Sequence, residues 1–176
     1  MYLKKIYIIG PVGSGKTTFS NNLSKKFNIK AYELDKIVWD DEKSMKRKDE
    51  EIIKLFNKIL KNDSWIIEDI GREKLKKGRY EADVIYYIKI SKIKSYYRVI
   101  KRWIKQRLRL EKYNQYPSLE QLKYFLSIVK SYYKKEKSKI KSLEEFNDKV
   151  IFINCRGIKK ILNKKMEGGI TCNTKK

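Results

Sequence analysis

The stretch IYIIGPVGSGKTTFS, residues 6–20, decides how this chain folds. It opens on an apolar run that is typical of a strand buried on both faces of a sheet. From Gly10 to Thr17 the sequence then fits the pattern G-x-x-x-x-G-K-S/T without mismatch. The glycines allow backbone angles that a Cβ would forbid, so amide groups can turn inward around an anion. The helix expected from Lys16 onward points its positive N-terminal end at the same anion.

This pattern predicts a loop that holds the phosphates of ATP, with ATP and Mg²⁺ as the bound species. Lys16 would contact the β- and γ-phosphates, and the hydroxyl of Thr17 would ligate Mg²⁺. The alternative is a plain glycine-rich turn, which the complete match between a strand and a helix disfavours. The expected nucleotide-binding residues are Gly10, Pro11, Val12, Gly13, Ser14, Gly15, Lys16, Thr17 and Thr18.

The length of 176 residues suits a single domain, which we expect over residues 1–165 with a flexible tail over residues 166–176. No apolar run approaches the ~18 residues of a membrane span, so we expect no membrane association and a place in the cytoplasm. Cys155 and Cys172 lack metal-ligand spacing and are expected as free thiols. The chain has no histidine, which excludes histidine-dependent triads and histidine zinc sites and leaves carboxylates as candidate general bases.

The formal net charge of +23 raises the question of nucleic-acid binding. Only eight of the 44 basic residues are arginine. Surfaces that grip phosphates favour arginine for its bidentate geometry, so a surplus of lysine is more typical of diffuse surface charge. We therefore expect any nucleic-acid binding to be non-specific and dependent on salt.

Strand-like and helix-like segments alternate along the rest of the chain. Such alternation predicts a mostly parallel sheet covered by helices on both faces, with ligands at the carboxyl ends of its strands. The expected strands cover residues 3–9, 30–35, 65–69, 83–90 and 149–154, and the expected helices cover residues 16–27, 49–61, 94–112 and 118–139, with a last short helix ending near residue 163.

Two of these strand ends carry candidate catalytic groups. Asp35 ends the second strand, where it could hold or deprotonate an acceptor hydroxyl, although it could equally be an acidic cap. Glu68 and Asp69 end the third strand, and one of them is expected to support Mg²⁺, because successive side chains point to opposite faces. Arg72 lies nearby and could bring a guanidinium to the acceptor, or be an ordinary surface charge.

The segment 94–112 carries half of the arginines. At about 100° per residue, Arg98, Arg102 and Arg109 share one face with Lys105. The opposite face, which we expect to pack on the body of the protein, carries Val99, Ile100, Trp103, Ile104, Leu108 and Leu110, with Arg107 as the exception. A cationic face of this kind suits a lid that senses phosphate; the alternative is an amphipathic helix with a solvated face.

The stretch INCRG, residues 153–157, ends the fifth strand. A loop there could pass over the adenine of the nucleotide, with Arg156 stacking on the ring. A simple turn between a strand and a helix explains the stretch equally well.

These pieces resemble, in this order, the P-loop kinase-like family of DNA topology modulation proteins (FlaR-like), related to adenylate, shikimate and gluconate kinases. The matching stretches are GPVGSGKT, LDKIVW, WIIED, EADVIYYIKI, RVIKRW and VIFINCRG. The resemblance implies a P-loop NTPase fold with three α/β/α layers and a five-stranded parallel sheet in the order 2-3-1-4-5. It also implies an adenylate-kinase-like helical lid, here over about residues 94–140.

The family's acid after its W-I-I run falls on Glu68, where Asp is usual, and its next glycine falls on Asp69. These two departures leave the metal ligand open between Glu68 and Asp69. The resemblance implies a phosphotransferase that moves the γ-phosphoryl group of ATP to a nucleoside monophosphate or a small hydroxyl compound. The alternative is a nucleotide-binding regulatory protein that contacts nucleic acid and hydrolyses ATP slowly.

Overall fold

The computed structural model describes residues 3–40, 45–111 and 117–163. Its central element is a parallel sheet of five strands, which lie side by side in the order β2, β5, β1, β6 and β7. Counted along the chain these are the five expected strands, so the predicted order 2-3-1-4-5 is confirmed. Their bounds are Lys5–Ile9 (β1), Ala31–Glu33 (β2), Trp65–Asp69 (β5), Val84–Ile88 (β6) and Val150–Ile153 (β7).

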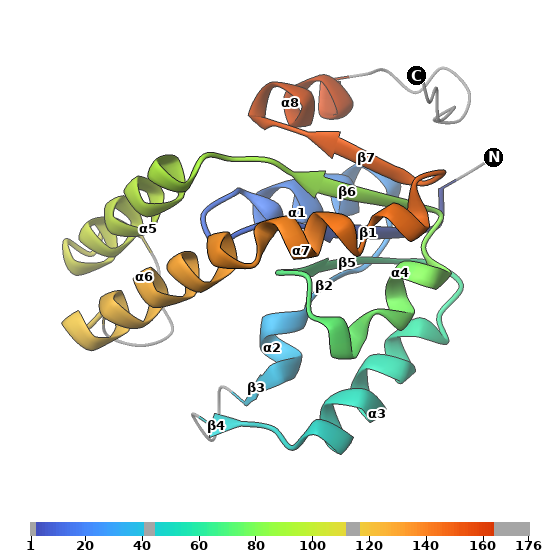
Figure 1. Ribbon diagram of the computed structural model, residues 1–176, viewed down its shortest axis with the longest axis horizontal. Helices are drawn as coiled ribbons and strands as arrows, with labels where there is room; N and C mark the ends of the chain where they lie inside the picture. The colour runs from blue at the N-terminus through green and yellow to red at the C-terminus, as the bar shows by residue number, and fades with distance from the viewer. Residues whose placement is uncertain (1–2, 41–44, 112–116, 164–176) are drawn as a thin grey trace.

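Helices cover both faces of this sheet, as Figure 1 shows. Alternate residues of β1 point to opposite sides, so Ile6 and Ile8 join one apolar cluster while Tyr7 and Ile9 join the other. On the first side the sheet packs against α1 (Lys16–Phe27) and α8 (Cys155–Asn163). On the second side it packs against α2 (Leu34–Val38), α3 (Asp49–Leu60) and the segment that follows α7 (Glu136–Lys141). The fold therefore has three α/β/α layers.

Two long helices, α5 (Lys92–Arg107) and α6 (Leu119–Lys134), lie side by side and extend beyond one end of the sheet (Figure 1). Ser118 caps the second of them, because its side chain accepts a hydrogen bond of 3.1 Å from the backbone N–H of Gln121. This pair occupies the segment in which we expected a lid. No helix among the described residues is long and apolar enough to cross a membrane.

Several short elements connect the layers. A small antiparallel pair, β3 (Trp39–Asp40) and β4 (Met45–Lys46), precedes α3. After β5 the chain forms a short 3₁₀ turn, Glu73–Leu75, and the helix α4 (Lys77–Glu81), and a second 3₁₀ turn, Glu144–Phe146, precedes β7. Gly78 permits a close approach of α4 to the sheet, because a Cβ there would lie 2.7 Å from the ring of Tyr7. The predicted tail, residues 166–176, and Cys172 lie outside the described residues.

Candidate active site

The glycine-rich loop that joins β1 to α1 takes the backbone angles that its glycines allow. Gly13 and Gly15 have φ angles of 77° and 94°, in the left-handed region that other residues rarely adopt. Space is also short at Gly13, where a Cβ would lie 3.2 Å from the carbonyl oxygen of Ser95 and 3.3 Å from the Cβ of Arg98. The loop is therefore pressed against α5, and only glycine fits at that point.

Lys16 folds back over this loop. Its side chain is buried, and Nζ donates a hydrogen bond of 3.0 Å to the carbonyl oxygen of Pro11. Burial lowers the pKa of Lys16, and the neighbouring carboxylates of Glu68 and Asp35 partly counter that shift. The hydroxyl of Ser14 is also buried, and it finds no hydrogen-bond partner among the described residues. The loop thus holds a cation and a polar side chain ready for a ligand that supplies oxygen atoms.

Glu68 ends β5 on the face of the sheet that carries α1. Its Oε1 accepts a hydrogen bond of 2.7 Å from the hydroxyl of Thr17, while Oε2 is buried and has no partner within the described ranges. Burial raises the pKa of Glu68, although the positive charge of Lys16 and the bond from Thr17 act in the opposite direction. An anionic oxygen without a partner, next to the threonine of the loop, is the donor set expected for a hard cation such as Mg²⁺.

Asp69 points to the opposite face, away from the loop. Its buried carboxylate accepts a hydrogen bond of 2.5 Å from the backbone N–H of Arg72 and pairs with the guanidinium of the same residue. Gly71 has a φ of 79°, which turns the chain back so that this pair can form. Between the two adjacent acids the geometry thus favours Glu68 for metal support, and the metal role of either residue stays a prediction.

Arg72 links Asp69 to Asp35. One end of its guanidinium pairs with Asp69, and the other pairs with Oδ1 of Asp35. Burial alone would lower the pKa of Arg72, but the two carboxylates more than offset it and raise that pKa. Asp35 does not end a strand as expected, because β2 stops at Glu33 and α2 begins at Leu34. Asp35 therefore lies in the first turn of a short helix, with its carboxylate largely exposed.

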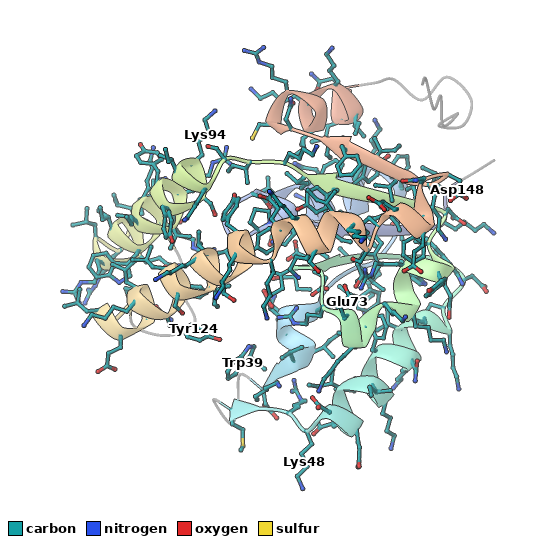
Figure 2. The ribbon with its side chains drawn as sticks, viewed as in Figure 1. Trp39, Lys48, Glu73, Lys94, Tyr124 and Asp148 are labelled. Carbon is teal, nitrogen blue, oxygen red and sulfur yellow. The ribbon has the colours of Figure 1, made fainter. Side chains whose placement is uncertain are left out.

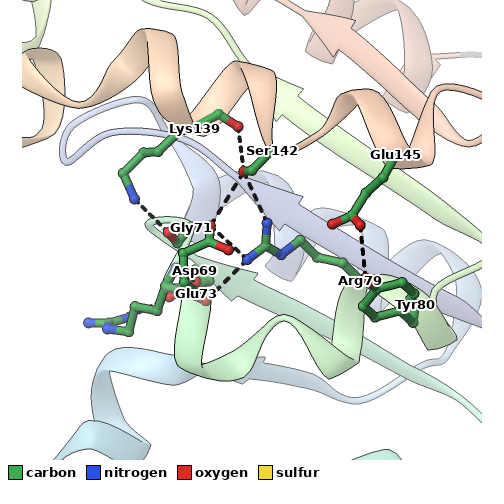
Figure 3. Close-up of polar contacts among 9 residues, drawn as sticks. Asp69, Gly71, Glu73, Arg79, Tyr80, Lys139, Ser142 and Glu145 are labelled. Carbon is green, nitrogen blue, oxygen red and sulfur yellow. Dashed lines mark hydrogen bonds and ion pairs between the residues drawn. The ribbon is translucent and has the colours of Figure 1, made fainter.

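A second polar cluster surrounds Asp69 on this face, as Figure 3 shows. The buried guanidinium of Arg79 pairs with Glu73 at 3.0 Å and also donates to the carbonyl oxygen of Arg72. Lys139, from α7, donates a hydrogen bond of 2.5 Å to the carbonyl oxygen of Gly71. These contacts fasten the turn that carries Arg72. Neither Arg79 nor Lys139 was predicted; Lys139 lies far from the site in sequence, and the folding of α4 back onto the turn brings Arg79 to Glu73.

Arg98 reaches the phosphate-binding loop from α5. Its guanidinium donates to the carbonyl oxygens of Gly13 at 3.0 Å and Ser14 at 3.3 Å, and its other nitrogen lies 3.2 Å from the sulfur of Cys155. Ser95 lies three residues earlier on the same helical face, and its hydroxyl donates a hydrogen bond of 2.5 Å to the carbonyl oxygen of Val12. The sequence analysis missed Ser95, although its position beside Arg98 on the helical face was a usable signal.

The other two predicted lid arginines do not accompany Arg98. Arg102 stacks its guanidinium on the ring of Phe125 in α6, at 5.3 Å from the ring centre. Arg109 is not on the helix, because α5 ends at Arg107 and Arg109 takes a left-handed φ of 57°. The backbone N–H of Arg109 donates to the carbonyl oxygen of Gln106, and the N–H of Leu110 donates to the carbonyl oxygen of Lys105. These two bonds are the pattern of a Schellman motif. The predicted alignment of Arg109 with Arg98 is therefore wrong.

The predicted orientation of the lid helix is also wrong in part. Val99 is buried, and Tyr96 and Trp103 are half-buried, but the other apolar side chains of this segment face solvent. The exposed set, which follows helical spacing along α5 until the helix ends, is Ile93, Tyr97, Ile100, Ile104 and Leu108, with Leu110 exposed just beyond it. The reason is that polar Ser95 and Arg98 find loop carbonyls on the inner side. Arg107, the predicted exception, lies over the ring of Trp103 on its own helix.

No loop follows β7, so the basis of the Arg156 prediction is wrong. The strand passes through Asn154 directly into α8, which begins at Cys155. The side chain of Asn154 accepts hydrogen bonds of 3.0 Å from the N–H groups of Arg156 and Gly157, and so caps the helix. Arg156 is an exposed residue of the first helical turn, and its stacking on adenine stays a prediction.

The residues of the loop fit ATP with Mg²⁺. The glycines with left-handed φ angles place no Cβ atom at the turns of the loop. The buried Nζ of Lys16 donates a hydrogen bond to one carbonyl oxygen of the loop. The unpartnered Oε2 of Glu68 beside Thr17 matches the oxygen donors that Mg²⁺ prefers. The roles of these residues toward nucleotide and metal stay predictions.

A glycine-rich loop after the central strand of a parallel sheet in this order defines a P-loop kinase-like α/β fold. The chain is similar to a solved structure described as a gluconokinase from Sinorhizobium meliloti 1021, with a TM-score of 0.52 and 11% sequence identity. The similarity covers 92% of this chain and 88% of that chain, so the fold is shared across nearly the whole length. No family model and no curated protein matches the sequence.

Proposed function

We propose that this protein is an ATP-dependent phosphotransferase that moves the γ-phosphoryl group of ATP to a small acceptor. The observation that carries the proposal is the division of the carboxyl edge of the sheet into two regions. Lys16, Thr17 and Glu68 gather on the α1 side, where they suit a nucleotide with its metal. On the other side Asp35 presents an exposed carboxylate, which suits an acceptor hydroxyl.

When bound, ATP with Mg²⁺ supplies the electrophilic γ-phosphorus and ADP as the leaving group. Lys16 and the loop amides would hold the β- and γ-phosphates and offset their charge. Thr17 and Glu68 would hold the metal ion. Asp35 would position the acceptor hydroxyl and take its proton as the new phosphorus–oxygen bond forms. Arg98, already in contact with the loop, is the lid arginine best placed to act on the phosphates.

Two finer assignments belong to this proposal. The stretches LDKIVW and WIIED support kinship with the DNA topology modulation proteins, and the need for ATP supports a place in the cytoplasm. The competing function, a nucleotide-dependent contact with nucleic acid, is supported by the net charge of +23 alone. Such binding would weaken steeply between about 50 and 200 mM salt.

The decisive experiment is a coupled assay of ADP release over nucleosides, nucleoside monophosphates, sugars and small alcohols. We expect at least one acceptor to raise the rate above that with ATP and Mg²⁺ alone. Lys16→Met, which retains the length of the side chain and removes its charge, is the matched control and should abolish that increase. Tight ATP binding without acceleration by any acceptor would instead favour the regulatory protein.

A further inference from the structure

A cavity of about 230 Å³ opens beside Arg72 on the acceptor side of the sheet. Its apolar wall comes from Val38 of α2, Ile52 and Ile53 of α3, and Leu75. Val38 lies three residues after Asp35 on the same short helix, so the two side chains share a helical face. Asp35 does not itself line the cavity, but its carboxylate pairs with Arg72, which does, so the guanidinium of Arg72 connects the cavity to Asp35.

The positive groups around this cavity are already paired. Arg72 lies between Asp35 and the buried Asp69. Lys46 and Lys74, which line the cavity, both pair with Asp49.

Arg79, in the cluster that Figure 3 shows, pairs with Glu73, which also lines the cavity. Among the described residues, each cation that lines the cavity therefore already has a carboxylate partner.

From this pairing we infer that the acceptor is an uncharged hydroxyl compound, of the class of polyols, sugars or nucleosides, seated in this cavity against Asp35. The inference rests on the proposed phosphotransferase function and narrows its acceptor. It excludes acceptors that carry a phosphate or a carboxylate as their recognition group, and so decides between the two acceptor classes that the sequence left open.

The physical reason lies in the cost of re-pairing Arg72. An anionic acceptor would have to displace Asp35 from the guanidinium, which leaves two negative groups close together. A hydroxyl group requires no such exchange. It can donate to Oδ2 of Asp35, which makes no hydrogen bond within the described residues, while Arg72 keeps Oδ1. Asp69 and Arg72 are then positioning residues, which hold Asp35 in place and balance its charge.

The test uses pairs of acceptors that differ only in one anionic group: a nucleoside and its 5′-monophosphate, and a six-carbon polyol and the matching aldonic acid. ADP release is measured for each, together with the shift in melting temperature that each causes in the ADP·Mg²⁺-loaded protein. We expect the uncharged member of a pair to have the higher kcat/KM by at least about tenfold. A preference for the anionic member would overturn the inference and leave the phosphotransferase proposal standing.

Asp69→Asn provides the second arm. The amide keeps an oxygen acceptor for the N–H of Arg72 but removes the buried charge, so the guanidinium becomes available to an anion. The ratio of kcat/KM between uncharged and anionic acceptors should fall several-fold. An unchanged or larger ratio would overturn the role of Asp69.

The control is Asp148→Asn, which changes the net charge equally. Asp148 is exposed and lies before β7, at the opposite end of the sheet from the site, and Figure 2 labels it. In this variant the ratio of kcat/KM between uncharged and anionic acceptors should be the same as in the parent.

If Asp69→Asn does not fold, Asp35→Asn gives the same test from an exposed position. Its kcat should fall for both acceptors while the ratio shifts toward the anionic one. If ATP binds but no acceptor of either kind raises ADP release or the melting temperature, the phosphotransferase proposal itself fails, which is a different result from an anionic preference.

Discussion

Glu68 and Asp69 are neighbours in one strand, yet they end in regions of opposite character. Glu68 faces the glycine-rich loop, and its buried Oε2 has no hydrogen-bond partner in the part of the chain that the structure describes. Asp69 faces the opposite side, where we place the acceptor and where Arg72 binds its carboxylate through both backbone and side chain. The two side chains diverge because successive residues of a strand point to opposite faces. One region thus keeps polar groups open for a ligand, and the other has its charges matched in advance.

The difference indicates two ways of preparing a site. Unpaired buried groups cost free energy in the unliganded protein and regain it when a ligand supplies the missing partner. A matched network costs less and holds its members in fixed positions, which suits the orientation of a reacting hydroxyl. Changes in the open region should therefore affect nucleotide binding, and changes in the matched region should affect acceptor use.

Lys16→Ala should have the largest effect. Within the described residues the one hydrogen bond of the Lys16 side chain is to a loop carbonyl, so its removal should leave the fold intact and remove the charge on which the phosphates depend. We expect tight ATP binding and turnover to fall by about 10³-fold or more, as when electrostatic stabilisation of a transferring group is lost. Isothermal titration with ATP and the coupled ADP assay measure both quantities, with melting temperature as the check on folding. Parent-like ATP binding and turnover would refute the assignment of the loop.

Asp35→Asn should affect acceptor use far more than ATP binding. The loss of a positioned general base typically lowers a rate by about 10²–10⁴-fold. ATP affinity should be nearly unchanged, because Asp35 pairs with Arg72 and acts on Lys16 through its charge without a hydrogen bond. Acceptor-dependent ADP release and ATP affinity, measured on the same preparation, separate the two regions. A variant with full acceptor-dependent activity would return Asp35 to the role of an acidic residue at a helix start.

Arg98→Ala should reduce turnover more than Arg102→Ala does. Arg98 touches the carbonyls of Gly13 and Ser14, whereas Arg102 packs on Phe125. We expect at least about a tenfold loss for Arg98 in line with other arginines that act on transferring phosphoryl groups. Arg102 is the matched control, since it changes the same charge on the same helix. Equal losses would mean that both residues act at the site once the lid closes over a ligand.

The local patterns in the sequence were sufficient for the five strands and for the conformation of the glycine-rich loop, whereas the order of the strands came from the family resemblance. The match from Gly10 to Thr17 involves adjacent residues, and the five strands appear as short apolar runs. The alternation of β5 also predicted that only one of its two acids could face the metal. The choice between the two acids depends on the register of β5 against β1, which the sequence does not show. Glu68 pairs with Ile8 of β1 and therefore falls on the side of α1.

The rest depended on contacts between distant segments. The apolar periodicity of α5 suggested that Ile100 and Ile104 would face inward, but the inner side is taken by Ser95 and Arg98, whose partners are carbonyls of the loop more than 80 residues away. The turn at Arg109 shows no glycine, so the helix end could not be read from its residues. Arg72 joins two carboxylates that belong to different elements, and nothing in the spacing of Asp35 and Asp69 indicates that they share it.

Glu68→Gln should give the smallest effect, and it concerns stability. Burial raises the pKa of Glu68 above its ordinary value of 4.5, so folding favours the protonated carboxyl. The stabilising contribution of that carboxyl is present below pH 4.5 and is lost as the pH rises through its pKa in the folded protein. Since glutamine does not titrate, the free energy of unfolding of the parent relative to the variant should fall as the pH rises from about 4.5, the ordinary pKa, toward neutrality.

Urea unfolding without nucleotide, at several pH values from below 4.5 to neutrality, measures this difference, and exposed Glu144→Gln is the control. Added ATP and Mg²⁺ should then stabilise the parent more than Glu68→Gln, because a metal ion favours the ionised carboxylate and supplies the partner that Oε2 lacks. A flat pH dependence in the first measurement would mean that the carboxylate is solvated in the unliganded protein. Equal stabilisation by the ligands would remove Glu68 from the metal site and, with it, the contrast between the two sides of β5.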